Sequence, residues 1–258
     1  EALTIYLDLV ATAIAADIVP MEGENRTLTF LGLQQFQENP RIGLQFFLKT
    51  LKKPIKVTDL VFVIAPRINA AGRMDQGLSA VELLMSDNLE LALLKARSID
   101  FFNTERRSTD ERITVEALQQ IVLNEETTCF STVVFHPSWH KGVIGIVASR
   151  LIETYYRPTV VLTESEGVLS GSVRSVSGFD VYQALEACSE FMIQFGGHKY
   201  AAGLTLKPEQ LTGFKQCFEA YAEALYPELT RLGFSDFSGY RALTSRTLDA
   251  WQTGAEVI

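Results

Sequence analysis

Cysteine is scarce in this sequence of 258 residues, which contains only three. Cys129, Cys188 and Cys217 lie far apart, and no pair has the C-x-x-C spacing of a zinc site. The pattern predicts neither a thiolate metal cluster nor a disulfide framework, and small buried side chains are the simplest interpretation. Because unpaired thiols favour a reducing compartment, we expect a cytoplasmic protein.

Long apolar runs are also missing. A membrane-spanning helix needs roughly 18–20 successive apolar residues, and the nearest approach, residues 2–19, is interrupted by Tyr6, Asp8 and Asp17. No basic segment precedes it, so it does not resemble a secretory signal. The sequence therefore predicts no membrane association. Since it starts with Glu1 in place of Met, Glu1 need not be the native start.

Positive charge is the third shortage. The 23 Lys and Arg residues are outnumbered by 31 Asp and Glu residues, which gives a formal net charge of −8. This balance argues against a protein that covers duplex DNA with basic side chains. It leaves room for a local basic groove around a single strand, since such a groove tolerates acidity elsewhere.

What is present is an ordinary globular composition, with 47% hydrophobic and 21% charged residues, long enough for two modest domains. Residues 3–16 predict an apolar helix that Pro20 ends. We expect a loop over 66–72 and a helix over 79–84. Residues 88–123 carry apolar side chains at three- and four-residue spacings without Pro or Gly, which predicts one long helix. At ~1.5 Å per residue it would span ~50 Å and suit a connector between domains.

Residues 128–225 predict a compact α/β unit, because β-rich runs alternate there with helical patterns. Such alternation implies a sheet covered by helices. The expected strands are 131–135, 159–163, 168–173 and 201–206, and the expected helices are 142–156, 180–191 and 209–225. Residues 226–258 show no clear periodicity and stay unassigned.

The most informative segment is residues 136–150, which leaves an expected strand and enters a helix with two glycines in its first turn. Backbone N–H groups at a helix N-terminus attract anions, and glycines let a phosphate approach closely. His136 and His140 add donors beside this point, and Trp139 offers a stacking face. Packing with a satisfied hydrogen bond is the ordinary alternative for these three side chains.

Two further segments could bind a phosphate. Ser172 and Arg174 stand two residues apart on an expected strand, so they share a face and offer a hydroxyl beside a bidentate guanidinium. A surface ion pair is the alternative. Gly196 and Gly197 precede His198, which would let the backbone approach a ligand and place the imidazole against it.

The N-terminal part of the chain holds two weaker candidates. Arg67, Asn69 and Arg73 share a glycine-containing loop that could bind a nucleotide or a phosphate, with a solvated surface as the alternative. Asp17 ends an apolar segment, with Glu-Asn-Arg following at residues 24–26. A carboxylate there could ligate Mg²⁺ or Mn²⁺, since hard cations prefer oxygen, although a helix cap or Asx turn would explain it as well.

Read in order, these segments are Ala-Asp-Ile-Val-Pro with Glu-Asn-Arg, Pro-Arg-Ile-Asn-Ala-Ala-Gly-Arg, His-Pro-x-Trp-His-x-Gly-Val-Ile-Gly-Ile-Val-Ala-Ser-Arg-Leu, Gly-Ser-x-Arg-Ser and Gly-Gly-His-x-x-Ala-Ala-Gly. Together they resemble the RecJ family of DHH phosphoesterases, from about residue 5 to about residue 225. Other DHH enzymes share Gly-Gly-His but not the Trp-containing segment. The resemblance implies an α/β chain: part of a DHH catalytic domain over 1–87, a connector helix over 88–127, and a mixed-sheet, substrate-binding DHH-associated domain over 128–225.

The resemblance also implies an activity, the metal-dependent 5′→3′ hydrolysis of single-stranded DNA in repair and recombination, with two Mn²⁺ or Mg²⁺ ions. By this resemblance Asp17 would ligate a metal and His198 would touch the scissile phosphate. Ser172 and Arg174 would hold the 5′-terminal phosphate. The remaining residues expected to contact substrate are Arg67, Asn69, Arg73, His136, Trp139, His140, Gly196 and Gly197.

The sequence departs from the family at the metal site. It contains no Asp-x-Asp and no Asp-His-His, and only one of the expected metal aspartates. In the family's order the missing motifs lie upstream of Glu1, which is consistent with a truncated chain. We therefore expect this chain to bind single strands weakly at most and not to cleave them. Residues 226–258 do not resemble the opening of the OB-fold that follows in the family.

Other interpretations stay open. A DHH phosphatase or oligonucleotide hydrolase would also carry Gly-Gly-His, and a non-catalytic single-strand-binding module would fit the missing metal motifs. An α/β domain of unrelated function is the third alternative. An Asp-His-His upstream of Glu1 would identify an enzyme fragment. The resemblance further implies a monomer whose partners are single-stranded DNA and helicases or single-strand-binding proteins.

Overall fold

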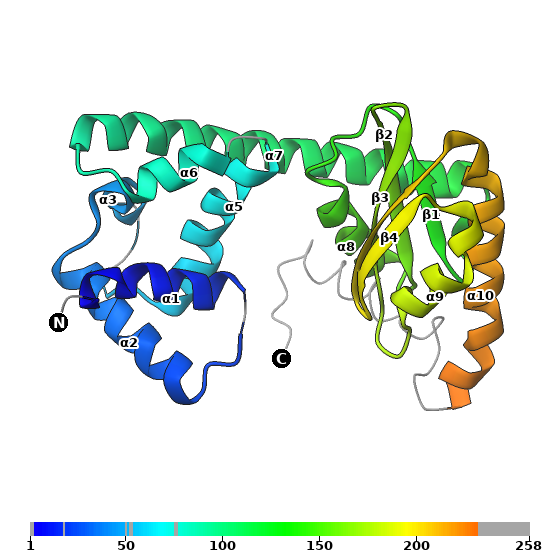
Figure 1. Ribbon diagram of the computed structural model, residues 1–258, viewed down its shortest axis with the longest axis horizontal. Coiled ribbons are helices and arrows are strands. Elements are labelled where there is room, and N and C mark those ends of the chain that lie inside the picture. The colour runs from blue at the N-terminus through cyan, green and yellow to red at the C-terminus, as the bar shows by residue number, and fades with distance from the viewer. Residues whose placement is uncertain (1–2, 18, 50, 52–53, 75–76, 232–258) are drawn as a thin grey trace, which may run out of the picture. The chain divides into compact units, whose positions relative to one another are not determined.

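The computed structural model describes residues 3–17, 19–49, 51, 54–74 and 77–231. The chain divides into two compact units, Glu1–Ser108 and Thr109–Ile258. Figure 1 shows the first unit in blue to cyan and the second in green to orange.

The first unit is helical. Its helices are α1 (Leu7–Ala16), α2 (Gly23–Glu38), α3 (Gln45–Leu48), α4 (Val57–Asp59), α5 (Ala65–Arg73), α6 (Gly77–Leu84) and the first part of α7 (Leu89–Leu123). α1 confirms the apolar helix expected over 3–16, with a 3₁₀ turn at Thr4–Tyr6 before it. Most of the buried hydrophobic side chains of this unit form one core, which includes Ala11, Phe36, Leu60, Leu83 and Ile99.

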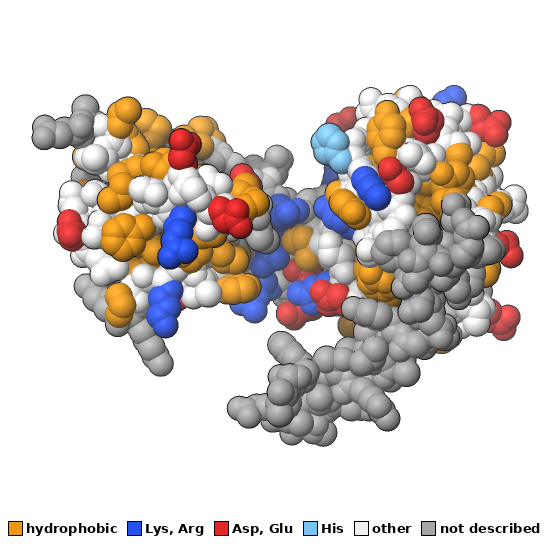
Figure 2. Space-filling view, turned by 90° about the horizontal axis from the view of Figure 1, so that it is seen from below, with side chains coloured by type: hydrophobic (Ala, Val, Ile, Leu, Met, Phe, Trp, Pro, Cys, Tyr) orange, Lys and Arg blue, Asp and Glu red, His pale blue; other side chains and the backbone are white. Residues whose placement is uncertain are grey.

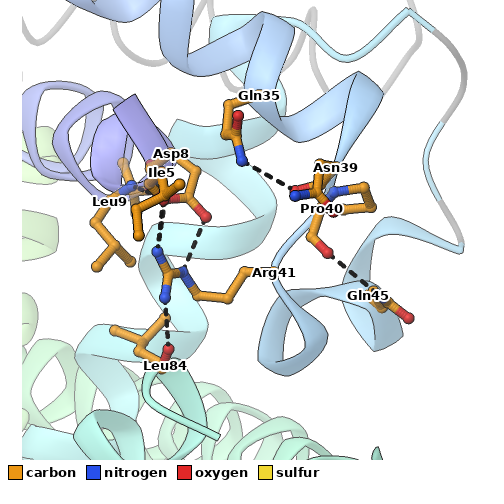
Figure 3. Close-up of polar contacts among 10 residues, drawn as sticks. Ile5, Asp8, Leu9, Gln35, Asn39, Pro40, Arg41, Gln45 and Leu84 are labelled. Carbon is orange, nitrogen blue, oxygen red and sulfur yellow. Dashed lines mark hydrogen bonds and ion pairs between the residues drawn. The ribbon is translucent and has the colours of Figure 1, made fainter. Parts of the chain in front are cut away.

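A buried ion pair ties three segments of the first unit together. Asp8 in α1 is 1% exposed and accepts hydrogen bonds from Arg41 Nε at 2.9 Å and Nη2 at 3.0 Å. The same guanidinium donates to the backbone oxygens of Ile5 and Leu84, as Figure 3 shows. A buried carboxylate is stable only when it is paired and hydrogen-bonded, so Arg41 makes the burial of Asp8 possible.

The loop expected over residues 66–72 is wrong, because these residues lie in helix α5. The helix continues from α4 through a π-helical turn at Leu60–Ile64. Pro66 lacks an N–H, and its ring would crowd the carbonyl four residues earlier in a regular α-helix. The wider turn just before Pro66 removes this conflict, so the proline is accommodated inside a continuous helical segment.

Most of the large hydrophobic side chains that are exposed among the described residues belong to the first unit. Hydrophobic side chains gather on the face of this unit that Figure 2 shows on the left. The most exposed of them are Leu3, Phe62, Leu78, Met85 and Leu94. This unit therefore buries its apolar surface less completely than the second.

Helix α7 confirms the long helix expected over 88–123. It runs without interruption for 35 residues and crosses the boundary between the two units after Ser108. Its N-terminal part contributes Ala92, Ala96 and Ile99 to the first core, and its C-terminal part contributes Ile113, Ala117 and Ile121 to a core of the second unit. The helix ends before residue 127, and a 3₁₀ turn at Glu126–Thr128 follows.

The second unit is built on a mixed sheet of five strands with the order β1-β2-β3-β5-β4. The strands are β1 (Thr132–Phe135), β2 (Thr159–Ser165), β3 (Val168–Arg174), β4 (Gln194–His198) and β5 (Ala201–Leu206). β1 and β2 are parallel, and all other pairs are antiparallel. Four of these strands were expected, whereas β4 was not, because its Gln-Phe-Gly-Gly-His sequence has no β-branched residue.

The two faces of this sheet differ in what covers them. On one face Val160, Val173 and Leu204 pack in a large core with helices α9 (Val181–Ala187) and α10 (Leu211–Arg231). On the other face Val134 and Val161 pack beneath α8 (Ile144–Thr154) and the C-terminal part of α7. Figure 1 shows α8 on one side of the sheet and α9 and α10 on the other. Side chains alternate between the faces along each strand.

No helix in the described part of the chain is both long enough and apolar enough to cross a membrane. α10 extends to Arg231, beyond the end expected at residue 225. The rest of the unassigned tail, residues 232–258, lies outside the described residues.

Candidate functional site

Ser172 and Arg174 come together on β3, as their spacing predicts. Arg174 Nη1 donates a hydrogen bond to Ser172 Oγ at 3.1 Å and another to the backbone oxygen of Val173 at 2.8 Å. Both side chains are half-buried, so they are held in place and still reachable from solvent. The pair offers a hydroxyl and a cationic planar fork at one point, which suits a phosphate.

The first turn of α8 lies directly against this pair. A Cβ atom at Gly145 would stand 2.9 Å from Arg174 Nη2 and 3.0 Å from Ser172 Oγ. Any side chain at position 145 would therefore push into the pair. The N-cap residue is Val143, whose side chain cannot accept a hydrogen bond from the helix. The electropositive N-terminus of α8 thus adds to the guanidinium at the same place.

His198 lies on the same face of the sheet as this pair. Arg174 is opposite Ala201 on β5, and Ala201 is opposite His198 on β4. Directly opposed residues of antiparallel strands point to the same face, so the guanidinium and the imidazole face the same way. Two strand spacings put their Cα atoms roughly 9–10 Å apart. The imidazole is exposed.

A two-residue turn fixes His198 in this register. Lys199 and Tyr200 join β4 to β5, and the backbone oxygens of both are hydrogen-bonded. Val181 N donates to Lys199 O at 3.0 Å, and Ser175 N donates to Tyr200 O at 3.0 Å. The turn that follows the imidazole is therefore anchored at two points to the segments around α9.

Gly197, which precedes His198, is a glycine for structural reasons. Its φ is +147°, and a Cβ there would meet the backbone oxygen of Ala201 at 2.4 Å. Only glycine combines this backbone conformation with strand pairing. Its neighbour Gly196 differs, because a Cβ there would have no neighbouring atom within 4 Å among the described residues.

Trp139 does not offer a stacking face. Its side chain is only 3% exposed and belongs to the core beneath α8. The indole Nε1–H donates to Glu116 Oε2 on α7 at 2.8 Å, which lowers the pKa of that carboxyl, and Arg112 adds to the effect. The ring is thus occupied by packing and by its hydrogen bond to α7, and a role of Trp139 in substrate binding stays a prediction.

His136 and His140 are exposed on either side of Trp139. His136 stacks against the Trp139 ring at 5.7 Å, and its Nδ1 lies 2.9 Å from Ser138 Oγ. His140 Nδ1 accepts a hydrogen bond from Gly142 N at 3.1 Å. These contacts shape the turn that leads into α8, and a role of the two histidines in substrate binding stays a prediction.

In the first unit the structure separates the three predicted residues of α5. Arg67 Nε donates to Asp100 Oδ1 at 2.7 Å, and its guanidinium lies 5.5 Å from the Phe47 ring centre. It is thus engaged with its own unit. Asn69 and Arg73 are exposed and four residues apart, which puts them on one face of the helix.

Asp17 is exposed at the C-terminal end of α1. Among the described residues there is no group of three or more His, Cys, Asp or Glu side chains that could hold a metal ion. Asp17 alone therefore does not fit a two-metal centre, because each ion needs several oxygen ligands. Whether it ligates a metal together with other groups stays a prediction.

Two residues beside the pair were not among the predicted site residues. Gly145 was noticed only as one of two glycines in a helix start, and its contact with Arg174 and Ser172 appears only in the structure. Gly203 is directly opposite Ser172, which only the strand register reveals. The signal for Gly203 in the sequence is a glycine inside a β-rich run.

Comparison with known proteins gives the class of this second unit. Residues 126–224 match the model of the DHHA1 domain family. The sequence is 37% identical over 222 residues to the "Single-stranded-DNA-specific exonuclease RecJ" of Bacillus subtilis, covering 84% of this chain and 28% of that protein. It is 36% identical over 236 residues to the protein of the same name from Escherichia coli, covering 86% of this chain and 41% of that protein.

Solved structures agree with the sequence comparison. The fold matches RecJ from Thermus thermophilus in complex with Mg²⁺ with a TM-score of 0.77 at 31% identity, over 86% of this chain and 35% of that chain. It matches the Mn²⁺ complex of the same protein with a TM-score of 0.78 at 32% identity, over 86% of this chain and 33% of that chain.

The chain thus carries a DHHA1 domain on a long helix. It belongs to the RecJ family and corresponds to a part of a RecJ protein. It spans less than half the length of the curated relatives named above. The mixed α/β fold that the resemblance implied is confirmed.

Proposed function

We propose that this chain forms the strand-binding part of a RecJ-type exonuclease, which hydrolyses single-stranded DNA from the 5′ end. The observation that carries the proposal is the pair of Ser172 and Arg174 under the first turn of α8, on the same sheet face as the exposed His198. The pair would hold the 5′-terminal phosphate, and His198 would contact the phosphate that is cleaved. Holding the terminal phosphate sets the polarity of the reaction.

The chemistry of the pair supports a terminal phosphate over an internal one. A terminal phosphate monoester carries more negative charge and presents three free oxygens, so it can bind the hydroxyl, the guanidinium and the helix N-terminus together. An internal phosphodiester offers only two. Arg174 as a bidentate donor would also orient the phosphate, which a single ammonium could not do.

We further propose that the complete protein needs divalent cations, Mn²⁺ or Mg²⁺, for hydrolysis. The relatives of known structure were solved with these two ions. Asp17 would contribute one ligand, and the described residues do not supply the others. The part of the reaction assigned to this chain is therefore binding and orientation of the strand. Purified alone, the chain is expected to release no nucleotides from labelled single strands in Mn²⁺, and measurable release would contradict this assignment.

The test of the phosphate site is a binding measurement with the chain itself. Fluorescence anisotropy or an NMR titration would compare a short oligothymidylate carrying a 5′-phosphate with the same oligonucleotide carrying a 5′-hydroxyl. We expect the phosphorylated strand to bind more tightly, and Arg174→Met to weaken its binding by about tenfold or more, since charged hydrogen bonds are lost. Ser172→Ala should have a smaller effect in the same direction.

Lys207→Met serves as the matched control, because it also removes a positive charge from the second unit, at an exposed position after β5. This variant should leave the preference for the 5′-phosphate unchanged. Equal affinity of the wild-type chain for the two oligonucleotides would contradict the proposal. So would an equal loss in the Arg174 and Lys207 variants, since general electrostatic attraction would then explain binding.

Several broader properties belong to the same proposal. Residues 1–87 would be part of the DHH catalytic domain, 88–127 the connector, and 128–225 the substrate-binding domain. A reducing compartment such as the cytoplasm suits the three free cysteines, Cys129, Cys188 and Cys217. A monomeric enzyme that works with helicases or single-strand-binding proteins remains the expected form, which sedimentation and co-purification of the complete protein would test.

A further inference from the structure

Exposed apolar side chains of the second unit concentrate at the C-terminal end of α7. In the described part of this unit six large hydrophobic side chains are exposed, and three of them, Val115, Val122 and Leu123, lie there. The opposite face of the same helical segment, with Ile113 and Ile121, is buried in the core. This end of α7 is therefore apolar on two faces, and contiguous exposed apolar surface marks a site of interaction.

The exposed face of α7 borders a shallow groove of about 500 Å³, which we call the α7–α8 groove. Its lining is mostly apolar and consists of Leu118, Gln119, Val122, Leu123, Thr154 and Tyr155. All of these residues belong to the second unit, so the groove is formed by that unit alone. They lie on α7 and at the C-terminal end of α8, and none of them belongs to a strand.

Tyr155 gives the groove a fixed aromatic wall. The guanidinium of the buried Arg157 lies 4.9 Å from the centre of the Tyr155 ring. That guanidinium is itself held by hydrogen bonds to acceptors in residues 126–132. An aromatic side chain that is already immobilised loses little conformational entropy on binding, so it suits an anchor point for a protein partner.

The unpaired charges around the groove have one sign. Glu111, Glu125 and Glu153 are exposed, and none of them forms an ion pair within the part of the chain that the structure describes. Glu125 follows Leu123 closely, and Glu153 precedes Thr154 in the groove lining. The neighbouring cations are already engaged in the ion pairs Arg112–Glu116, Arg150–Asp110 and Lys215–Glu126. The rim is therefore negative.

This charge selects among the possible occupants of the groove. A nucleic acid is disfavoured, because its phosphates would meet the carboxylates of the rim. A second copy of this chain is disfavoured as well, since its net charge is −8. A small molecule would find few polar groups to orient it in so open a groove. An apolar segment flanked by Lys or Arg matches both the lining and the rim.

We propose that the α7–α8 groove is a docking site for a basic amphipathic helix of a separate protein. The apolar side of that helix would pack on Val122, Leu123 and Tyr155, and its cations would face Glu125 and Glu153. A helix suits the site better than an extended segment, because the groove offers no strand edge to pair with and a helix satisfies its own backbone.

The docking site is separate from the phosphate pair that we propose to bind the DNA strand. The pair lies at the N-terminal end of α8, at Gly145, whereas the groove lies at the C-terminal end of the same helix. α8 has 11 residues, so at ~1.5 Å per residue the two sites are about 15 Å apart. A docked partner would thus leave the strand site free.

The test uses three labelled peptides of about 14 residues, the length of an ordinary helix. The first carries Leu at helical spacing and Lys elsewhere, the second has Glu in place of each Lys, and the third is a scrambled form of the first. Fluorescence anisotropy with the whole chain measures binding at about 0.15 M salt. We expect the first peptide to bind about tenfold more tightly than either of the others.

Substitutions in the groove locate the binding. Val122→Thr combined with Leu123→Gln removes apolar surface and keeps residues of similar helix propensity, and we expect it to weaken binding of the first peptide by about tenfold. Glu153→Gln should weaken it by about threefold, because an exposed charge pair contributes little. The matched controls are Ile193→Gln, at an apolar position that is 53% exposed outside the groove, and Glu209→Gln, at another exposed glutamate.

Several results would overturn the proposal. Equal binding of the ordered and scrambled Lys peptides, or equal losses in the groove and control variants, would mean general electrostatic attraction. Tighter binding of the Glu peptide would contradict the assigned charge. Self-association of the wild-type chain in sedimentation, abolished in the double variant, would identify a second copy as the occupant. A peptide that binds this chain but not the complete protein would show that another part of that protein covers the groove.

The strand-binding measurement separates this inference from the proposed function. The preference for a 5′-phosphate over a 5′-hydroxyl should be the same in the double variant of Val122 and Leu123 as in the wild type. Loss of that preference in the double variant would contradict two separate sites. If the wild-type chain shows no such preference, the phosphate site fails, and the peptide measurements still decide the docking site.

Discussion

The two faces of the five-stranded sheet are made by the same strands and have opposite properties. One face carries Val, Leu and Phe side chains that are buried under α9 and α10. The other is apolar only under α8 and α7, and over β5 and β4 it carries Gly, Ala, Thr, Gln and His. Because side chains alternate along each strand, one sequence can specify a buried apolar core on one face of the sheet and an exposed polar surface on the other.

This comparison shows which face of the sheet supplies the core of the second unit, and our proposal assigns strand binding to the other face. Changes on the buried face should alter the free energy of unfolding and leave strand binding intact. Changes over β5 and β4 on the other face should do the reverse. The predictions that follow are ordered by the size of the expected effect on stability.

The largest effect is expected from Leu204→Ala. Leu204 is 4% exposed on the buried face of β5, and truncation would leave a cavity, so we expect a loss of about 3 kcal/mol in the free energy of unfolding. Its neighbour Thr205 points to the opposite face, and Thr205→Ala should cost less than about 1 kcal/mol. Denaturation by urea, followed by circular dichroism, measures both. Similar losses of stability in the two variants would contradict the claim that only one face of β5 supplies the core.

A smaller effect is expected from Trp139→Phe, which removes the hydrogen bond to Glu116. We expect a loss of about 2 kcal/mol near pH 7, because the bond has a charged acceptor that is partly exposed to water. The pKa of Glu116 is lowered in the folded state, so its stabilising effect is complete above the ordinary glutamate pKa of 4.5 and is lost as pH falls through the lower folded value.

The stability gap between wild type and Trp139→Phe should therefore narrow on acidification below pH 4.5. Val122→Ala on α7, a position that is 57% exposed, provides a control whose gap should not depend on pH. A gap for Trp139→Phe that stays constant down to acid pH would mean that packing, and not the hydrogen bond to the carboxylate, accounts for the loss.

The smallest effect is expected at Gly171, which lies on β3 with its Cα hydrogen directed into the core. A Cβ there would meet Leu162 and Leu204 atoms at 2.7 and 3.0 Å, so Gly171→Ala should overpack the core and cost about 1 kcal/mol. The same substitution at Gly203 should be neutral or stabilising. Thermal melts of the two variants show whether each substitution lowers or raises the melting temperature. A lower melting temperature in both variants would mean that the two faces of the sheet tolerate an added side chain equally poorly.

Much of this fold could be predicted from the sequence, for identifiable reasons. The long apolar pattern of α7 and the β-branched runs of β1, β2 and β3 are local signals, and the structure confirms them. β4 was missed because an exposed, glycine-rich edge strand carries no apolar alternation. Pro66 was interpreted as a loop residue because the sequence does not reveal the π-helical turn that accommodates it.

The site could be predicted less completely. The spacing of Ser172 and Arg174 put them on one face, which the structure confirms. Trp139 was interpreted as exposed because its hydrogen bond to Glu116 joins residues 23 positions apart, which no local pattern reveals. The alignment of Ser172, Gly203 and Gly196 depends on the register of three strands, and register is a property of the folded sheet.

The two-residue turn between β4 and β5 also limits which insertions and deletions the chain tolerates there. Substitutions at Lys199 or Tyr200 should leave the direction of His198 unchanged, because the two carbonyl contacts of this turn involve only backbone atoms. A single inserted or deleted codon in the same place would shift the pairing of β4 by one residue and turn the imidazole towards α9 and α10. Length at this point should therefore be under stronger selection than residue identity.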